Sequence, residues 1–353
     1  MLSSISLTAF RGIDELTLSL GKRTYIMGAN GSGKTHILDV IHMLAGSKLL
    51  YGDSTLDVGT QFEGVFLEDD LAKSYRMFRD ENREYFSIQG SKITKPKYMQ
   101  ALPWRTVHIS PFDMNLLYFA PSIRRDYIDL ILARTHEQFT HVRRDYELTM
   151  RSRNALLKKI RDGLTKREDL DFWDKKFAEY AYMYGLYRSK YRDYIISSLS
   201  RFPEFFGKYS PEFFYESDWI NEEDPQKFIE QYLLENRERD ILTGHTHIGP
   251  HRDDWRFKVI HNGEHIAIEN YLSRGEMKMI LLGLKMIEID YIGKILGIPM
   301  ILLVDDIFAE LDDTNSNIFL SSFMQHQIIL TSQKTLPNHE KYHDFICINL
   351  SNP

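Results

Sequence analysis

The sequence of 353 residues contains a single cysteine, Cys347, and no long apolar run. One cysteine excludes a disulfide framework and a zinc site built from cysteines, and it is typical of a reducing compartment. Because no run of about 18 apolar residues occurs, we expect no transmembrane helix. The first residues lack a basic segment followed by an apolar one, so we expect no signal peptide. The net charge of -6 argues against a protein that coats nucleic acid by overall basicity, although not against a local basic surface.

A glycine-rich loop near the N-terminus has the pattern of a phosphate-binding site. The preceding segment 24–27 is short, apolar and partly β-branched, which predicts a buried strand. After the loop, Ile37, Ile41 and Leu44 recur at helical spacing. Strand, G-x-x-x-x-G-K-T loop and helix are the context that a P-loop requires, so the sequence predicts nucleotide binding. The loop residues are Gly28, Ala29, Asn30, Gly31, Ser32, Gly33, Lys34 and Thr35.

The residue types in this loop suit the chemistry of a nucleotide. Glycines let backbone N–H groups turn inward around phosphates, and the helix N-terminus adds a partial positive charge. Lys34 can reach the β- and γ-phosphates of ATP, and the Thr35 hydroxyl can ligate Mg²⁺. The alternative is a flexible glycine turn without a ligand.

A second strand with carboxylates at its end is expected near the C-terminus. The five apolar residues 300–304 predict a strand buried on both faces, as in a parallel sheet. Asp305 and Asp306 follow directly. Asp305 is the candidate ligand of Mg²⁺ or its water, and Asp306 is the candidate base that polarises the attacking water. The alternative is a surface turn after a core strand.

About 264 residues separate Thr35 from this strand, more than a compact P-loop domain needs, so we expect an insertion. Within that stretch, Ser273 and Glu276 precede an apolar periodic run and predict a helix start closed by a capping box. The pattern also resembles the Ser-x-Gly-x signature of ABC-class ATPases, with Ser273 and Gly275 facing the γ-phosphate of a second subunit. The segment 309–312 resembles their D-loop. A well-capped core helix is the alternative.

Taken in order, these and further motifs resemble those of the RecF family, which is related to SMC and Rad50 heads. The match runs nearly from end to end of the chain. The additional segments are Ala9–Gly12, Ser110–Asp113, Ala120–Asp129, Arg153–Lys158 and Gly249–Asp254.

The resemblance implies an α/β fold, with an ABC-type P-loop ATPase head assembled from the N- and C-terminal segments. We expect the head in residues 1–112 and 241–353 and a mainly helical lobe in 113–240. ATP with Mg²⁺, an ATP-dependent homodimer, DNA at gaps or single-strand/double-strand junctions, and RecO- and RecR-type mediators are the implied partners. The implied role is recombinase loading, replication-fork maintenance and the SOS response in the bacterial cytoplasm.

Some positions depart from the family pattern. Residues 47–52 replace a basic His-Arg pair, Phe112 replaces an acid, and Ala120 replaces a glycine. Asp306 agrees with the family but is one methylene shorter than the Glu of most ABC enzymes, so we expect slow hydrolysis. The usual switch histidine is absent, because the strand ending at residue 330 continues into Thr331, Ser332 and Gln333.

The middle of the chain combines aromatic residues with opposite charge runs. Five tyrosines spaced three and four apart, at 180, 184, 187, 191 and 194, predict one helix face that is either a core seam or a base-stacking surface. Residues 141–167 carry a net charge of +6 and residues 216–240 carry -6. The basic stretch either neutralises DNA phosphates or pairs with the acidic one. Its candidate DNA-binding residues are Arg143, Arg144, Arg151, Lys158 and Lys159.

Other functions remain open on the sequence alone. His245, His247, His251 and Asp253 are too loosely spaced to predict a metal site, and a structural loop is favoured. No heptad pattern of about 100 residues appears, so no SMC-type coiled-coil arm is expected. A transport-type ABC subunit would need a membrane partner, which we do not expect here. A nucleotide switch that acts only through protein contacts is the other alternative.

Overall fold

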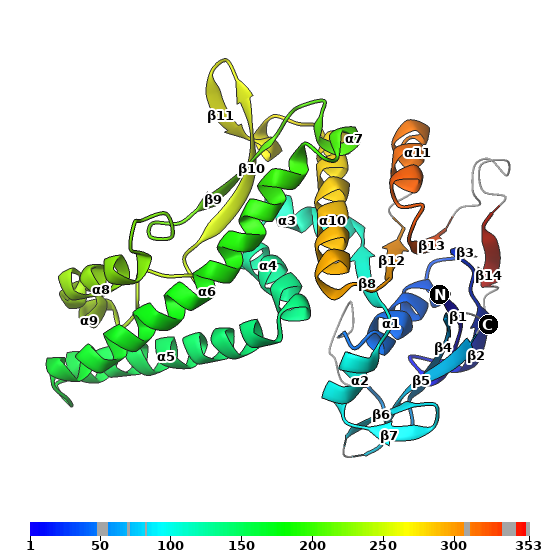
Figure 1. Cartoon of the computed structure of the whole chain (residues 1–353), viewed down its shortest axis with the longest axis horizontal. Coiled ribbons are helices and arrows are strands. Elements are labelled where there is room, and N and C mark those ends of the chain that lie inside the picture. Colours follow the sequence, from blue (N-terminus) through cyan, green and yellow to red (C-terminus); the bar gives the residue numbers. More distant parts are fainter. Residues whose placement is uncertain (48–55, 69–70, 82, 307–310, 334–343, 351–353) are drawn as a thin grey trace. The chain divides into compact units, whose positions relative to one another are not determined.

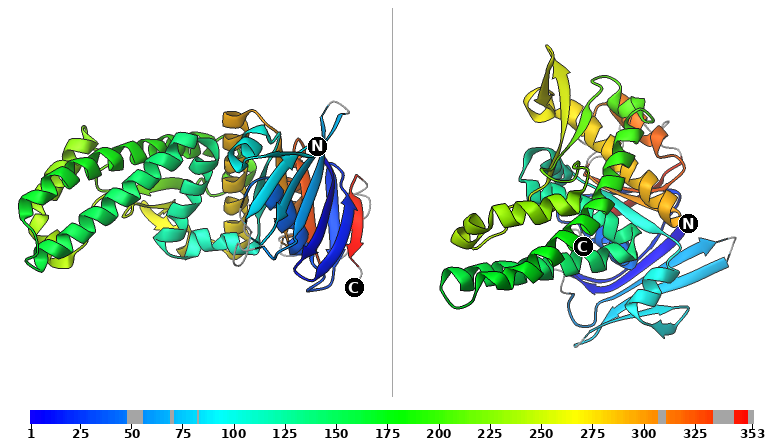
Figure 2. Two further views of the ribbon diagram at one scale, coloured as in Figure 1. Left: turned by 90° about the horizontal axis from the view of Figure 1, so that it is seen from below. Right: turned by 60° about the vertical axis from the view of Figure 1, so that its left-hand side comes forward.

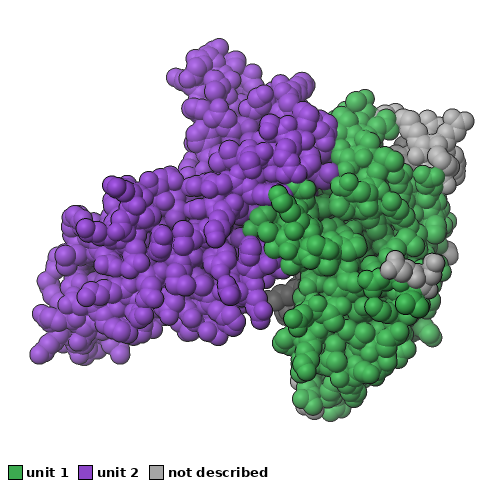
Figure 3. Space-filling model, viewed as in Figure 1, with its two compact units in different colours: residues 1–113, 288–353 green, residues 114–287 purple. Residues whose placement is uncertain are grey.

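The computed structural model describes residues 1–47, 56–68, 71–81, 83–306, 311–333 and 344–350 (Figure 1). The chain divides into two compact units (Figure 3). Unit 1 contains residues 1–113 and 288–353, and unit 2 contains residues 114–287. None of the described helices combines the length and the apolar character needed to cross a membrane.

A parallel sheet of five strands forms the centre of unit 1, in the order β14-β3-β13-β12-β8. Every residue of β12 is buried, and β12 pairs in parallel with β13 on one side and β8 on the other. The predicted buried parallel strand is therefore confirmed. The strands are β3 (Arg23–Gly28), β8 (Arg105–Ile109), β12 (Met300–Asp305), β13 (Gln327–Ser332) and β14 (Ile346–Leu350).

An antiparallel sheet of six strands covers the other side of α1 (Lys34–Leu44), in the order β2-β1-β4-β5-β6-β7 (Figure 2). Because α1 lies between the two sheets, most of its residues are buried, including the polar Asp39 and His42. The Gln327 side chain joins the sheets through hydrogen bonds with the Leu2 N–H and carbonyl, at 2.9 and 2.7 Å. The strands are β1 (Leu2–Phe10), β2 (Ile13–Ser19), β4 (Gln61–Glu68), β5 (Leu71–Arg79), β6 (Glu84–Ile88) and β7 (Ser91–Ile93), and the unit also contains α2 (Lys95–Ala101) and α11 (Asp313–Ser322).

Unit 2 is mainly helical, and its two longest helices, α5 and α6, run alongside each other (Figures 1 and 2). A three-stranded antiparallel sheet, β11-β10-β9, completes it. The helix α10 (Arg274–Leu296) begins in unit 2 and continues into unit 1. The other elements are α3 (Asn115–Tyr118), α4 (Pro121–Thr135), α5 (Glu137–Arg161), α6 (Leu170–Leu199), α7 (Pro203–Phe206), β9 (Glu212–Glu216), α8 (Pro225–Glu235), α9 (Arg237–Thr243), β10 (Asp254–His261) and β11 (Glu264–Ala267).

The C-terminal boundary of unit 2 differs from the one expected from the sequence. We expected the head to resume at residue 241, whereas residues 241–287 belong to unit 2. The reason is pairing at long range: β10 forms its ladder with β9, from Asp254 opposite Glu216 to Lys258 opposite Glu212. Because β9 lies in unit 2, its ladder with β10 keeps β10 in unit 2 as well.

The tyrosine face of α6 is divided between core and surface. Tyr184 and Tyr191 are buried, and the Tyr184 ring packs edge-on against Phe139 and Tyr146 of α5, at 5.2 and 5.1 Å between centroids. The other three tyrosines of the face are partly exposed. Part of the stripe is thus a core seam between α5 and α6.

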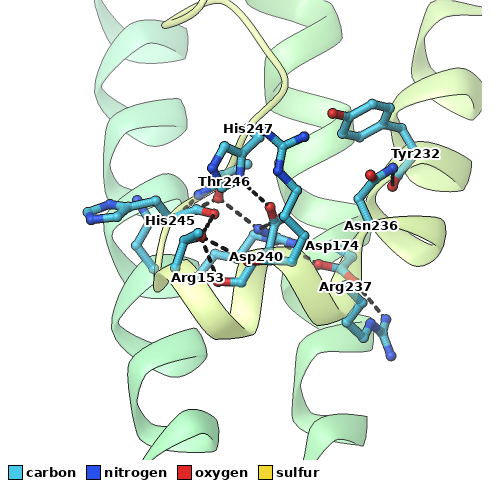
Figure 4. Close-up of polar contacts among 12 residues, drawn as sticks. Arg153, Asp174, Tyr232, Asn236, Arg237, Asp240, His245, Thr246 and His247 are labelled. Carbon is cyan, nitrogen blue, oxygen red and sulfur yellow. Dashed lines mark hydrogen bonds and ion pairs between the residues drawn. The ribbon is translucent and has the colours of Figure 1, made fainter.

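A buried ionic network joins α5, α6 and α9 (Figure 4). The fully buried Arg153 donates to Asp174 Oδ1 at 2.7 Å, and to Asp240 Oδ2 and Thr246 Oγ1 at 2.8 Å. His247 Nδ1 lies 2.7 Å from the other oxygen of Asp240. Two buried carboxylates therefore share the Arg153 guanidinium, and Arg237 also binds Asp174 at 2.6 Å, so that removing Arg153 leaves Asp240 without an arginine partner.

We expect Arg153→Ala to lower the free energy of unfolding of unit 2 by about 3–5 kcal/mol, because it leaves the buried Asp240 without its arginine partner and Asp174 with Arg237 alone. Urea denaturation followed by tryptophan fluorescence measures this. Arg144→Ala is the matched control on the same helix, since Arg144 is 61% exposed, and it should change stability by about 0.5 kcal/mol or less. Equal effects of the two substitutions would contradict a structural role for the network.

Candidate nucleotide-binding site

The loop between β3 and α1 has a backbone that requires glycine. Gly31 and Gly33 have φ values of +81° and +88°, in the left-handed region that favours glycine. Gly28 has a different reason: a Cβ there would lie 2.3 Å from Ser32 Oγ. The loop thus turns tightly into the N-terminus of α1, where backbone N–H groups are not used by the helix.

Lys34 lies against this loop with its side chain almost fully buried. Its Nζ donates to the carbonyls of Gly28 and Ala29, both at 2.8 Å, and the residue is 7% exposed. Nearby, Ser32 Oγ is buried without a hydrogen-bond partner among the described residues. Phosphate oxygens could replace the two carbonyls as acceptors for Lys34 Nζ, and they could accept a hydrogen bond from the Ser32 hydroxyl. Both groups therefore suit a loop that binds phosphate.

The two ends of the chain meet at Asp305, the last residue of β12. Thr35 Oγ1 donates to Asp305 Oδ2 at 3.0 Å, and Thr331 Oγ1 donates to Asp305 Oδ1 at 2.5 Å. Asp305 is 9% exposed. A hydroxyl and a carboxylate beside a phosphate loop are the oxygen donors with which proteins hold Mg²⁺, the remaining ligands being phosphates and water. The described residues include no cluster of three acidic, His or Cys side chains that could hold a metal alone.

Asp306 follows in an uncommon backbone conformation. Its φ is +50°, and its N–H donates to the Thr331 carbonyl at 3.2 Å. Gln333 Nε2 donates to Asp306 Oδ2 at 3.0 Å, while Oδ1 is buried and has no partner within the described part of the chain. A carboxylate oxygen that is withdrawn from bulk water and unoccupied by protein donors is suited to orient a water molecule. Strained residues of this kind often mark functional sites.

The predicted capping box at the start of α10 is confirmed. Glu276 accepts from the Ser273 N–H and from Ser273 Oγ, at 2.9 and 2.8 Å, and its own N–H donates to Ser273 Oγ at 3.4 Å. Lys208 and Tyr209 also donate to this carboxylate. The Ser273 N–H bond, with a further contribution from Lys208, lowers the pKa of the Glu276 carboxyl.

The structure brings Lys34, Thr35, Asp305 and Asp306 together in unit 1, whereas Ser273 and Gly275 belong to unit 2. Thr331 and Gln333, which donate hydrogen bonds to Asp305 and Asp306, are further candidate site residues, and the sequence did not predict these contacts. The only signal for them was their place after a buried strand, where a histidine was expected. Residues 309 and 310 of the expected D-loop, and residues 48–52, lie outside the described residues.

The five basic candidates for DNA contact all lie on α5, and three of them are tied to acids or carbonyls of that same helix. Arg143 bonds Glu147 at 2.9 Å, Arg144 bonds Asp145 at 3.0 Å, and Arg151 donates to the Glu147 carbonyl at 3.2 Å. The acidic stretch 216–240 instead contacts other basic residues: Arg153 binds Asp240, and Arg167 binds Glu238. The two charge runs therefore meet through residues outside the candidate set.

The histidine block 245–253 forms the inner structure of unit 2. His251 Nε2 lies 3.0 Å from the Thr246 carbonyl and His251 Nδ1 lies 2.6 Å from Tyr146 Oη. Since a carbonyl only accepts, Nε2 carries the proton and Nδ1 accepts from the tyrosine. The Asp253 carboxylate accepts from Tyr215 Oη and Trp219 Nε1, at 2.8 and 3.0 Å.

Comparisons with known proteins agree with this geometry. A family model described as an AAA domain matches residues 4–243. The chain is 28% identical to the DNA replication and repair protein RecF of Lachnoclostridium phytofermentans, over 94% of this chain and 92% of the relative. It is 29% identical to the protein of the same name from Agathobacter rectalis, over 94% and 91% of the two chains.

Solved structures match over nearly the whole chain. The structure described as the recombination mediator protein RecF-ATP in the RecFOR pathway has a TM-score of 0.80 at 23% identity, covering 96% of this chain and 93% of that one. This similarity shows the fold, an α/β unit built from both ends of the chain with a mainly helical insertion. From the family model and the RecF relatives together, the chain belongs to the AAA domain family of ATPases and, within it, to the RecF family.

Proposed function

We propose that this protein is an ATP-dependent DNA-binding protein of repair and recombination, which closes as a dimer on gapped or junction DNA. The observation that carries the proposal is the meeting of Lys34 and Thr35 from one end of the chain with Asp305 and Asp306 from the other. Its support beyond the site is the name of the relatives, DNA replication and repair protein RecF. Recombinase loading and fork maintenance in the bacterial cytoplasm, with RecO- and RecR-type mediators, belong to the same proposal.

In this proposal the loop 28–35 binds the phosphates of ATP. Lys34 exchanges its two carbonyl partners for β- and γ-phosphate oxygens. Thr35 and Asp305 hold Mg²⁺, which when bound neutralises charge that develops on the phosphates. Asp306 orients the attacking water and accepts its proton.

Hydrolysis is expected to be slow. Asp306 carries a carboxylate on a short side chain, and Gln333 occupies one of its two oxygens. The shorter reach places the base farther from the γ-phosphate than a glutamate would. Slow turnover gives the ATP-bound state a long lifetime, which suits a clamp rather than a motor.

In this proposal a second copy supplies Ser273 and Gly275 to each nucleotide site, which makes the closed state a dimer. Ser273 and Gly275 open α10, and a Cβ added at Gly275 would meet no described atom within 4 Å. Packing within the described part of the chain therefore does not require glycine at this position. Close approach of a γ-phosphate held by a second copy does. ATP then favours the closed dimer because it makes more contacts in that state.

DNA contact is assigned to Arg143, Arg144, Arg151, Lys158 and Lys159 of α5. The three arginines lie on or near the surface with hydrogen-bond partners on the same helix, and Arg143 is also 3.7 and 3.9 Å from Asp126 and Asp129 of α4. Intrahelical partners of this kind are weak and exchange readily with phosphate oxygens. The attraction would weaken as salt rises, because neutralising DNA phosphates releases counterions.

Lys34→Ala should lower the affinity for ATP by about tenfold or more, because it removes the charge-assisted contacts to phosphate. Light scattering should then show no ATP-driven dimer, and DNA binding in a salt series should no longer respond to ATP.

Lys22→Ala is the matched control, since Lys22 is an exposed lysine just before β3, and it should leave both measurements unchanged. ATP-driven dimerisation that survives in Lys34→Ala would sink the clamp mechanism. DNA-independent ATPase activity without salt-dependent DNA binding in the wild type would leave a nucleotide switch acting through proteins.

Asp306→Asn should reduce ATP hydrolysis by about 10²–10⁴-fold while preserving the dimer formed with ATP, since general-base catalysis contributes on that order. A single-turnover assay with labelled ATP measures the first quantity, and light scattering over time measures the second. Asp305→Asn is the comparison: it should weaken binding of Mg-ATP itself. Normal hydrolysis in Asp306→Asn would show that another group activates the water.

A further inference from the structure

Unit 2 contains a hollow of about 300 Å³ that the nucleotide site does not use. Its walls come from α4, α5, α6 and the segment before β10, all within unit 2. Its volume is at the lower end of the range for small-ligand sites. Four arginines line it, Arg125, Arg143, Arg151 and Arg188, against three carboxylates, Asp126, Asp129 and Glu147.

The hollow gathers residues from segments that are far apart in the sequence. Arg125 and Asp129 come from the segment 120–129, and His251 comes from the segment 249–254. Both segments are among those that carry the family resemblance, yet neither contributes to the phosphate loop or to Asp305. Both segments line the same hollow, and binding of ATP at the phosphate loop does not explain why they do so.

The inner wall is held in one arrangement. The buried Arg188 donates from Nε and Nη2 to the two oxygens of Asp129, both at 2.9 Å, and from Nη1 to the Pro250 carbonyl at 2.6 Å. His251 beside it has both ring nitrogens occupied. Burial, with smaller effects of Arg252 and Arg125, lowers the pKa of His251 to about 4, so its ring is neutral near pH 7. This wall is therefore polar and preorganised.

The outer wall has cations whose partners can be exchanged. Arg143 Nε donates to Glu147 Oε1 at 2.9 Å, and their side chains are 34% and 43% exposed. Arg125 and Arg151 donate to the carbonyls of Asp253 and Glu147, and neither has a carboxylate partner among the described residues. A guanidinium has five N–H donors, so most of theirs remain for a ligand. Asp126 and Asp129 lie 3.7 and 3.9 Å from Arg143, whereas the Glu147 carboxylate is in hydrogen-bond contact and occupies the position that another oxyanion would take.

We propose that this hollow binds the phosphate monoester of a nucleotide. Several arginine forks around one point match the geometry of phosphate oxygens, and a monoester carries up to two negative charges. A double helix is far wider than the hollow, whereas a strand end or a free nucleotide fits. The entering phosphate displaces Glu147, which moves into solvent. The choice of DNA as the bearer rests on the proposed function, and a free nucleotide is the other source of the same group.

The test compares short single-stranded oligonucleotides with a 5′-phosphate, a 3′-phosphate or hydroxyl ends, measured by fluorescence anisotropy with the full-length protein. We expect the wild type to prefer one phosphorylated end by about tenfold, the value of a charge-assisted contact. Arg151→Gln should remove the preference. Glu147→Gln should strengthen it several-fold, because the competing carboxylate is gone, whereas a merely structural pair would give no gain. Arg161→Gln is the matched control, since Arg161 lies on α5 but neither lines the hollow nor belongs to the proposed DNA contacts.

Titration with dAMP and with inorganic phosphate, followed by calorimetry, identifies the source. If dAMP displaces the phosphorylated oligonucleotide with an affinity equal to that of the strand end, the hollow is assigned to a free nucleotide. If only another phosphorylated strand end displaces it, the hollow is assigned to DNA. Equal affinity for phosphate and hydroxyl ends together with no heat from dAMP overturns the proposal. If DNA of every kind fails to bind, the proposed function fails, and the dAMP titration with Arg151→Gln still decides the hollow by itself.

Discussion

The hydrogen bond from Thr35 to Asp305 joins residues 270 positions apart, and the candidate nucleotide site depends on it. It requires β3 and β12 to lie in one sheet, although the whole of unit 2 intervenes between them in the sequence. Loop-closure entropy grows only slowly with loop length. An insertion of this size is therefore tolerated, provided that the parallel ladders on both sides of β13 compensate for it.

The strand β13 sets the geometry of the site because it pairs with both halves of the head. Thr331 lies opposite Asp305 on β12 and opposite Ile26 on β3. Its hydroxyl donates to the Asp305 carboxylate, and its carbonyl accepts from the Asp306 N–H. A slip of one residue in either ladder would turn these side chains to the other face of the sheet. The register of the two ladders therefore fixes the positions of Asp305 and Asp306 relative to Thr331.

The sequence predicted those features that are written in short, contiguous patterns. The phosphate loop, the apolar strand ending at Asp305 and the capping box at Ser273 and Glu276 each depend on residues within about ten positions. The extent of unit 2 was not predictable in this way, since residues 241–287 join it through the pairing of β10 with β9. The contacts of Thr331 and Gln333 depend on strand register, which no local pattern encodes. The five basic residues of α5 were found by charge alone, and their partners only by structure.

The charges of unit 2 fall into two physical classes, and only one of them can serve a ligand. Arg153 is fully buried between two carboxylates. Removing Arg153 would leave the buried Asp240 without an arginine partner, so this arginine is committed to holding the helices together. Arg143 is one third exposed, and its partner Glu147 can return to water at little cost. Net charge cannot separate these classes, because both are nearly neutral. Burial and the freedom of the partner separate them, and by that criterion Arg143, and not Arg153, belongs to the proposed ligand contacts of unit 2.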